Sequence, residues 1–263
     1  MIVQRDLPEI KIDVDNAYIL AASDFHFPFE DPGVVSVFLT EAENTQPEYI
    51  ILNGDVLDFY MLSKFSKNKN ERPVEQEIEI AKNFLQDLRG RCPESKIYYV
   101  IGNHETRLEK YVCDNAPDIA NMVVDFYQSL DCENLDIVGC ASVLFNDEFL
   151  FEHGTCVSAK AGLSAIKELE KYYISGATGH THRAAKYVTM RRGKRYVHLE
   201  LGCMCSLDPS YMIYPDWQHA LGVITFRNGE LDKADVFEIY KGRLLKWYAY
   251  KVLDTIDCKI LIL

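Results

Sequence analysis

Short apolar runs, each followed at once by polar residues, recur along the first two thirds of the chain. They span residues 17–23, 49–53, 97–101, 149–152 and 173–178. Buried strands of a parallel sheet read as such near-continuous apolar runs. Residues 34–42, after Asp31-Pro32, and residues 75–88 show a helical period instead. The alternation predicts an α/β domain, in which ligands bind at the carboxyl ends of the strands.

The pattern changes near residue 184. The segments KYVTM and RYVHLEL flank a predicted turn, RRGK, and ALGVITF precedes a second turn, RNGE, and a strand-rich tail that reaches Trp247 and Tyr250. Such hairpin signals predict a second, more antiparallel sheet packed beside the first. Because no repeat or linker interrupts the chain, we expect one domain over residues 1–263.

Composition narrows the class of protein. The 263 residues include 28 basic and 40 acidic side chains, a net charge of −12, and 48% are hydrophobic, which is typical of a globular domain. The acidic balance disfavours a protein that coats duplex DNA. Eight cysteines without a C-x-x-C pair suggest reduced thiols, and no run resembles a signal peptide or a membrane span. We therefore expect a cytoplasmic protein with no membrane partner.

The polar residues that follow the apolar runs form five clusters, which include five of the seven histidines. Taken singly, each cluster is also consistent with a turn or a helix cap. Together they favour a metal site of nitrogen and oxygen ligands, without cysteine, which suits manganese, iron, zinc or cobalt. The clusters are Asp24-Phe25-His26, Gly54-Asp55-Val56-Leu57-Asp58, Gly102-Asn103-His104-Glu105, His153-Gly154 and Gly179-His180-Thr181-His182.

Charge arithmetic suggests the substrate of such a site. Two divalent cations contribute about +4, Asp24 and Asp55 return −2, and a bridging hydroxide leaves the centre near +1. A centre of this charge attracts an anion, and paired metals favour hydrolysis of a phosphate ester.

The ordered pattern D-x-H, G-D-x-x-D, G-N-H-[DE], a later His and G-H-x-H resembles that of the calcineurin-like metallophosphoesterase superfamily. The resemblance implies a four-layer α/β/β/α sandwich of two mixed β-sheets flanked by helices. It also implies two divalent ions, manganese first, with iron, zinc, nickel or cobalt as alternatives. One ion would be held by Asp24, His26, Asp55 and His182, and the other by Asp55, Asn103, His153 and His180.

The same resemblance implies the catalytic roles. A hydroxide bridging the metals would attack the phosphorus, with Asp55 as the shared ligand. His104 would lie over the scissile phosphate and protonate the leaving oxygen, and Glu105 would orient His104. Asp58 resembles an outer partner of the site, with a helix or loop cap as the alternative. The segment GDVLDFY lacks the Arg-Gly of the Ser/Thr protein phosphatases, which disfavours a protein substrate.

Basic residues near the clusters favour a phosphodiester of a nucleotide or of single-stranded nucleic acid over a monoester. Residues 59–73 interleave Lys64, Lys67, Lys69 and Arg72 with Phe59, Tyr60 and Phe65, a composition that suits phosphates and stacked bases. The alternative is a solvated loop whose aromatic side chains lie in the core. Arg107 and Arg183 are candidates for a phosphate fork, although Arg107 could instead pair with a nearby acid on a helix.

Three further features are noted. Residues 207–223 resemble a segment of phage and prophage members of the superfamily, where Trp217, Gln218 and His219 would form a substrate wall or surround a buried Trp. Residues 183–195 include six basic and no acidic residues, most of them at the predicted hairpin tip. Cys203 and Cys205, two apart in a strand, are expected in the core.

Two functions are the alternatives to a phosphodiesterase: a phosphomonoesterase that acts on a small molecule or protein, and a non-catalytic interaction scaffold. The oligomeric state stays open.

Overall fold

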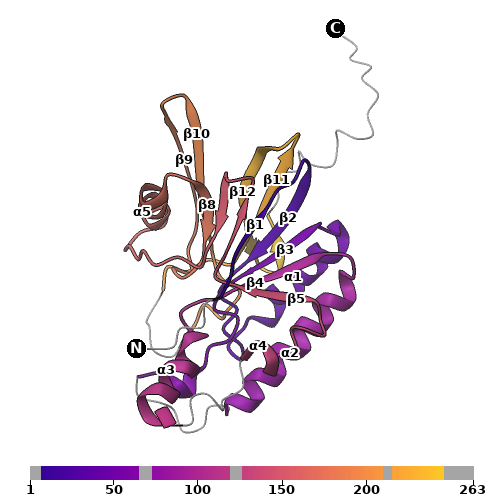
Figure 1. Ribbon diagram of the computed structural model, residues 1–263, viewed down its shortest axis with the longest axis vertical. Coiled ribbons are helices and arrows are strands. Elements are labelled where there is room, and N and C mark those ends of the chain that lie inside the picture. Colours follow the sequence, from indigo (N-terminus) through magenta and orange to yellow (C-terminus); the bar gives the residue numbers. More distant parts are fainter. Residues whose placement is uncertain (1–6, 65–72, 119–125, 210–214, 246–263) are drawn as a thin grey trace.

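Two mixed β-sheets pack face to face, with helices on both outer faces (Figure 1). The computed structural model describes residues 7–64, 73–118, 126–209 and 215–245. The seven-stranded sheet contains, in order across it, β13 (Arg243–Leu244), β12 (Glu230–Tyr240), β11 (Ala220–Arg227), β2 (Ala17–Ala22), β3 (Tyr49–Asn53), β4 (Lys96–Val100) and β5 (Ile137–Cys140). The six-stranded sheet contains β1 (Glu9–Ile12), β6 (Ser142–Phe145), β7 (Phe149–Phe151), β8 (Ser175–Thr178), β10 (Lys194–Leu201) and β9 (Ala184–Arg191).

The predicted four-layer α/β/β/α sandwich is confirmed. Helices α1 (Pro32–Thr45) and α2 (Val74–Arg91) cover the outer face of the seven-stranded sheet, and α5 (Leu163–Tyr172) packs on β8 and β10 of the other sheet. The smaller helices are α3 (Thr106–Asn115), α4 (Phe126–Ser129) and the 3₁₀ turn η1 (Tyr60–Leu62). No helix of the described residues is both long and apolar enough to cross a membrane.

Alternate residues of each central strand face different layers, since successive side chains of a strand point to opposite faces. In β2, Ile19 and Ala21 pack between the two sheets, whereas Leu20 and Ala22 pack under α1 and α2. Both faces are therefore apolar, which explains the uninterrupted apolar run. Strands β2, β3, β4 and β5 are parallel, so their carboxyl ends share one edge of the sheet.

Helix α1 begins where the sequence places a cap. The Asp31 carboxylate accepts hydrogen bonds from the backbone N–H groups of Gly33 and Val34, at 2.9 and 3.1 Å, and Pro32 occupies the first helical position. Helix α2 has Glu75 in its first turn and Arg91 in its last, as the helix dipole favours.

The prediction that both hairpins form one second sheet is wrong. The β9–β10 hairpin joins the six-stranded sheet through β8, whereas the β11–β12 hairpin joins the seven-stranded sheet, where β11 pairs antiparallel with β2. A hairpin's own sequence specifies its two strands but not the distant strand beside which it lies. The strand predicted at residues 173–178 begins only at Ser175, because Tyr173 caps the end of α5 with a φ of 52°. Trp247 and Tyr250 lie outside the described residues.

We expect Phe145→Ala to lower the free energy of unfolding by about 3–5 kcal/mol, the usual cost of emptying an aromatic site in a core. Phe145 is fully buried between the sheets, with its ring centroid 5.1 Å from that of Tyr49 in the facing sheet. Urea unfolding measures the change. Val138→Ala on the exposed edge strand β5 is the control and should change stability by about 0.5 kcal/mol at most. Equal effects of the two variants would contradict this packing.

Candidate metal centre

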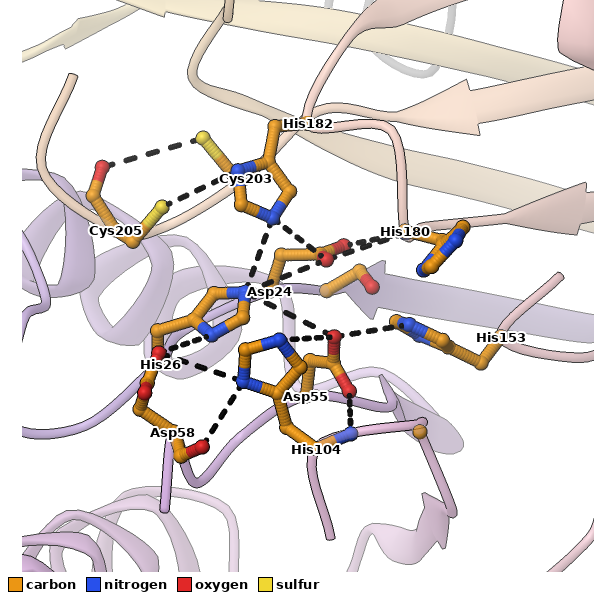
Figure 2. Close-up of polar contacts among 12 residues, drawn as sticks. Asp24, His26, Asp55, Asp58, His104, His153, His180, His182, Cys203 and Cys205 are labelled. Atoms are coloured by element: carbon orange, nitrogen blue, oxygen red, sulfur yellow. Dashed lines mark hydrogen bonds and ion pairs between the residues drawn. The ribbon is translucent and has the colours of Figure 1, made fainter. Parts of the chain in front are cut away.

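Six of the seven predicted ligands, all except Asn103, gather where the strands end, as Figure 2 shows. Asp24, Asp55, His153 and His180 each lie two residues beyond the last residue of a strand, namely β2, β3, β7 and β8. Backbone hydrogen bonds tie these loops together, among them one from the N–H of Asp24 to the carbonyl of Gly54, at 3.0 Å, and one from the N–H of Gly179 to that of His153, at 3.0 Å. The two sheets therefore bring loops more than a hundred residues apart into one pocket.

Five of these residues have a left-handed backbone, with φ between 50° and 66°: Asp24, His26, Asp55, His180 and His182. For residues other than glycine this conformation costs about 1 kcal/mol or more, and it clusters at functional sites. Glycine is required beside them, because a Cβ on Gly179 would overlap Ser23 Oγ and the Asp24 carboxylate. The backbone of these loops thus adopts unfavourable conformations that place the side chains in the site.

A first group of ligand atoms comes from Asp24, His26 and His182, all buried. The Nε2 atoms of the two histidines are 3.0 Å apart, and Asp24 Oδ1 lies 3.1 Å from His182 Nε2 and 3.6 Å from His26 Nε2. Ligands about 2.1 Å from a shared ion are separated from one another by roughly 3.0–3.4 Å. The spacing of the group fits a single cation.

A second group comes from Asp55, His153 and His180. His153 Nδ1 donates a hydrogen bond to the carbonyl of Asn53, at 2.9 Å, so in the neutral ring Nε2 has a lone pair. That buried Nε2 receives no hydrogen bond from the described residues and faces Asp55 Oδ2 at 3.1 Å. Two electron-rich atoms this close need a proton or a cation between them, so this group also fits a metal ion.

Asp55 lies between the two groups (Figure 2). Its Oδ1 accepts a hydrogen bond from the N–H of His104, at 2.9 Å, and its Oδ2 is directed to the histidines. Oδ2 lies 3.1 Å from His153 Nε2 and 3.9 Å from His26 Nε2, one histidine from each group. Asp55 Oδ2 is therefore directed to histidines of both groups.

The outer ring nitrogens of three histidines are held by three different partners. His26 Nδ1 lies 3.0 Å from Asp58 Oδ2, His153 Nδ1 bonds the Asn53 carbonyl, and His182 Nδ1 lies 3.7 Å from the Cys205 thiol. Such outer partners fix the orientation of a ligating imidazole. Each ring consequently directs Nε2 towards the pocket. Asn103 differs, because its side chain is exposed, and its role as a ligand stays a prediction.

The carboxylates and imidazoles of the pocket shift one another's pKa. Burial would raise the pKa of Asp24, but the neighbouring His182 outweighs it and holds that pKa well below its usual range; Asp55 is lowered in the same way by His153. Burial would lower the histidine pKa values, yet Asp55 raises that of His153 to about 10, and Asp24 raises that of His182 to about 9. In the metal-free protein, protons on the histidines thus balance the buried carboxylates.

His104 lies beside Asp55, is only partly buried and has a cation next to it. Its Nδ1 donates to the carbonyl of Asp58, at 3.0 Å, which leaves the Nε2 lone pair to accept a hydrogen bond from Arg107 Nη2, at 2.8 Å. Arg107 Nη1 also contacts Asp58 Oδ1, at 3.2 Å. Asp58 therefore joins His26, His104 and Arg107, as expected of an outer partner of the site, and Arg107 is paired with an acid, the alternative left open by the sequence.

Residues 17–187 match the family model described as calcineurin-like phosphoesterase. The match covers more than half of the chain. This chain belongs to the calcineurin-like phosphoesterase family.

Two phage proteins are similar over most of their length. The Gene 54 proteins of Mycobacterium phages D29 and L5 are 25% and 24% identical to this chain, each alignment covering 86% of this chain and 94% of the phage protein. Among solved structures, Vps29 of Entamoeba histolytica complexed with Zn²⁺ has 13% identity and a TM-score of 0.46, covering 87% of this chain and 96% of that one. Vps29 of Cryptosporidium parvum has 16% identity and a TM-score of 0.48, covering 88% and 96%. At this level of similarity, the solved structures bear on neither the activity nor the ligands of this chain.

Glu105 does not orient His104, which was the role expected for it. The buried carboxylate accepts hydrogen bonds from the hydroxyl of Tyr99 and from the N–H groups of Asp55, Leu57 and Gly102, at 2.8 to 3.1 Å. A carboxylate has about four acceptor positions, so these bonds leave none for the His104 ring. Glu105 supports the loop of Asp55, and Asp58 contacts His104 instead.

The residues predicted to bind substrate lie in different environments. Phe59 is fully buried in the core, where its ring lies 6.4 Å from that of Phe126, so for this residue the alternative of an aromatic side chain in the core is confirmed and the ring is not available for base stacking. The Arg183 guanidinium forms two hydrogen bonds with Asp216, at 2.7 and 2.9 Å. Trp217 is half-buried, with its ring 4.2 Å from that of His182, beside the pocket. Residues 65–72 and 210–214 lie outside the described part of the chain.

Sequence reasoning missed two side chains of this site. Cys205 was expected only to fill the core, but its thiol contacts His182. Glu77 of α2 accepts a hydrogen bond from the N–H of Phe59, and burial raises the pKa of this carboxyl to about 8. An acid on the apolar face of an amphipathic helix is the signal that could have identified Glu77. No local signal identifies Cys205, because its partner lies 23 residues away.

We expect metal binding at neutral pH to release about two protons, because a ligating imidazole must be neutral and the Nε2 atoms of His26 and His182, 3.0 Å apart, can hold only one proton between them. The pKa of His26 is raised, that of His182 is raised to about 9 and that of His153 to about 10, so these protons are held at neutral pH in the metal-free protein. The apparent affinity for metal should therefore increase as the pH rises from neutral towards these pKa values. Calorimetric titration in buffers of different ionisation enthalpy counts the protons.

Two variants sharpen the measurement. His153→Ala should release one proton fewer than the wild-type chain. His198→Ala is the control, because burial lowers the pKa of His198 to about 4 and leaves that ring neutral before metal is added. A binding heat independent of the buffer would contradict the assigned protonation.

Proposed function

We propose that this chain is a binuclear metal-dependent phosphoesterase that hydrolyses a phosphodiester of a nucleotide or nucleic acid. The observation that supports it best is the position of Asp55 Oδ2, which lies within 4 Å of a histidine from each ligand group. A carboxylate shared in this way is expected where two cations act together on one phosphate. Membership of the calcineurin-like phosphoesterase family supports the same reaction class.

The proposed ligands divide between two ions. Asp24, His26, Asp55 and His182 would hold one ion, and Asp55, Asn103, His153 and His180 the other. Imidazole and carboxylate suit manganese, which we propose first, and also iron, zinc, nickel and cobalt. When bound, such a pair lowers the pKa of a water molecule and stabilises negative charge on the phosphoryl oxygens.

The side chains around the ions would supply proton transfer and a second positive charge. We assign His104 as the acid that protonates the leaving oxygen, because its Nε2 is 3.8 Å from Asp55 Oδ2 and only partly buried. To act as an acid, Nε2 must give up its hydrogen bond with Arg107 and take up a proton from water, and the protonated ring then donates that proton to the leaving oxygen. The freed guanidinium would then be adjacent to a phosphate oxygen, so Arg107 would bind the phosphate as His104 acts.

The preference for a diester over a monoester is supported by basic residues beside the pocket. Lys64 is exposed just after η1, and Arg107 lies against His104. Lys67, Lys69 and Arg72 belong to the part of this basic segment outside the described residues. A small-molecule phosphatase is the alternative activity, and an interaction scaffold is the non-enzymatic one.

Hydrolysis of an aryl phosphodiester and an aryl phosphomonoester tests this proposal. We expect the chain loaded with Mn²⁺ to cleave the diester with the higher kcat/KM, and EDTA to abolish the activity. A higher kcat/KM for the monoester would indicate a phosphatase instead. A folded chain that binds metal but cleaves neither ester would reject the enzymatic proposal and favour the scaffold.

We expect His104→Ala to lower kcat by roughly 10²–10⁴-fold, the usual contribution of a positioned acid. Elemental analysis should find its metal content unchanged, since the ring is not among the proposed ligands. Asp55→Ala is the contrasting variant and should lose both ions and all activity. Unchanged turnover of His104→Ala would reject the assigned acid, and full metal occupancy of Asp55→Ala would reject the shared ligand.

A further inference from the structure

A positively charged arm extends from the loop that contains His180 and His182. Strand β9 begins at Ala184, and β10 pairs with β8 only across His198–Glu200. The remaining ends of β9 and β10 pair with each other, and Figure 1 shows this hairpin projecting beyond the neighbouring strands. We call this hairpin, residues 184–201, the β9–β10 arm.

The arm has the opposite charge to the rest of the molecule. Residues 184–199 contain five cationic and no acidic side chains, in a chain whose net charge is −12. Lys186 is paired with Asp235 of β12. The other four cations are exposed at the tip: Arg191, Arg192, Lys194 and Arg195. Such a concentration of positive charge on an acidic protein favours a polyanionic ligand.

Aromatic rings lie among these cations. The Arg191 guanidinium is 4.1 Å from the ring centroid of Tyr173, and Lys194 Nζ is 5.5 Å from that of Tyr196. Tyr172 and Tyr173, at the end of α5, are 43% and 44% exposed, so their rings are accessible to a ligand. Cations that bind phosphates and exposed rings that stack on unpaired bases are the two features of surfaces for single-stranded nucleic acid.

The length of the arm distinguishes a polymer from a mononucleotide. Eight extended residues of β9 span about 26 Å, at roughly 3.3 Å per residue. Ala184 is two residues from His182, whereas Arg191 is at the far end of the strand. A mononucleotide at the metal centre is too short to reach the tip, but a strand of several nucleotides can contact both.

We propose that the β9–β10 arm and the adjoining end of α5 bind single-stranded nucleic acid and direct it to the metal centre. This inference rests on the proposed phosphodiesterase function and identifies its substrate as a polymer. The cations at the tip bind the backbone, and Tyr172 and Tyr173 stack on bases. Duplexes bind less tightly, because their bases are not available to these rings.

Charge reversal at the tip tests the arm. The variant is Arg192→Glu/Arg195→Glu, and the matched control is Lys241→Glu/Arg243→Glu on the β12–β13 hairpin. Arg192 and Lys241 both have a left-handed backbone, with φ of 50° and 51°, and each precedes a glycine. Both double variants change the net charge equally, so the comparison isolates the location of the charge. Arg192→Gln/Arg195→Gln is a milder version that needs no reversed charge to fold.

Fluorescence anisotropy of labelled oligothymidylate and oligouridylate measures binding in EDTA, where no cleavage occurs. With oligomers of roughly 16 nucleotides, the upper end of single-domain site sizes, we expect the tip variant to bind at least about tenfold more weakly than the control. The slope of log K against log salt should fall by about 1.4 for two lost phosphate contacts. Equal binding by tip variant and control, no binding by the wild-type chain, or tip-dependent binding only to anionic phospholipid vesicles would overturn the inference.

Hydrolysis of the aryl phosphodiester separates this inference from the proposed function. The tip variant should cleave that small ester at the wild-type rate and lose efficiency only on the oligomers. A wild-type chain that cleaves the small ester without binding oligomers refutes the arm alone. A chain that binds oligomers through the tip and cleaves neither substrate refutes the proposed hydrolysis and supports the binding surface.

Discussion

Carboxylates buried where strands end must be compensated by neighbouring groups, and the whole pocket depends on this constraint. Asp24 and Asp55 are at most 1% exposed, and an isolated buried charge costs several kcal/mol. In the metal-free chain, His153 and His182 compensate them and in return have raised pKa values. The same close approach that stabilises these pairs brings nitrogen and oxygen ligands to the spacing of a metal ion. Stability and metal affinity therefore have one physical source.

The surrounding framework aims the ligands. A carboxylate, a backbone carbonyl and a thiol each contact the outer nitrogen of one histidine, in His26, His153 and His182 respectively. Beneath them, the Glu105 carboxylate holds the loop of Asp55 through backbone N–H groups, and the left-handed residues turn their side chains inwards. Because these contacts exist before any ion binds, the ligands need little rearrangement to bind one, which reduces the cost of assembling the centre.

The candidate metal centre and the surfaces proposed to bind substrate are built differently. The ligands follow buried strands and are held by many hydrogen bonds, whereas Arg107 and the β9–β10 arm lie where solvent and ligand can reach them. Arg183 shows that a cation near the centre is not automatically available, since Asp216 already binds its guanidinium. Under the proposed function, substrate preference would reside in exposed cations whose partners can be exchanged.

By itself the sequence indicated an α/β domain and the polar clusters beyond each buried strand, because apolar runs and the residues that end them are local features. Through its resemblance to the calcineurin-like superfamily, the sequence also implied the α/β/β/α sandwich and which side chains would meet. It did not decide which sheet each hairpin joins, nor that Phe59 is buried, that Glu105 supports Asp55 rather than His104, or that Cys205 contacts His182. Those outcomes depend on pairings between distant segments, such as β11 with β2, and on the few hydrogen-bond positions that each buried group offers. Only the packed tertiary structure specifies them.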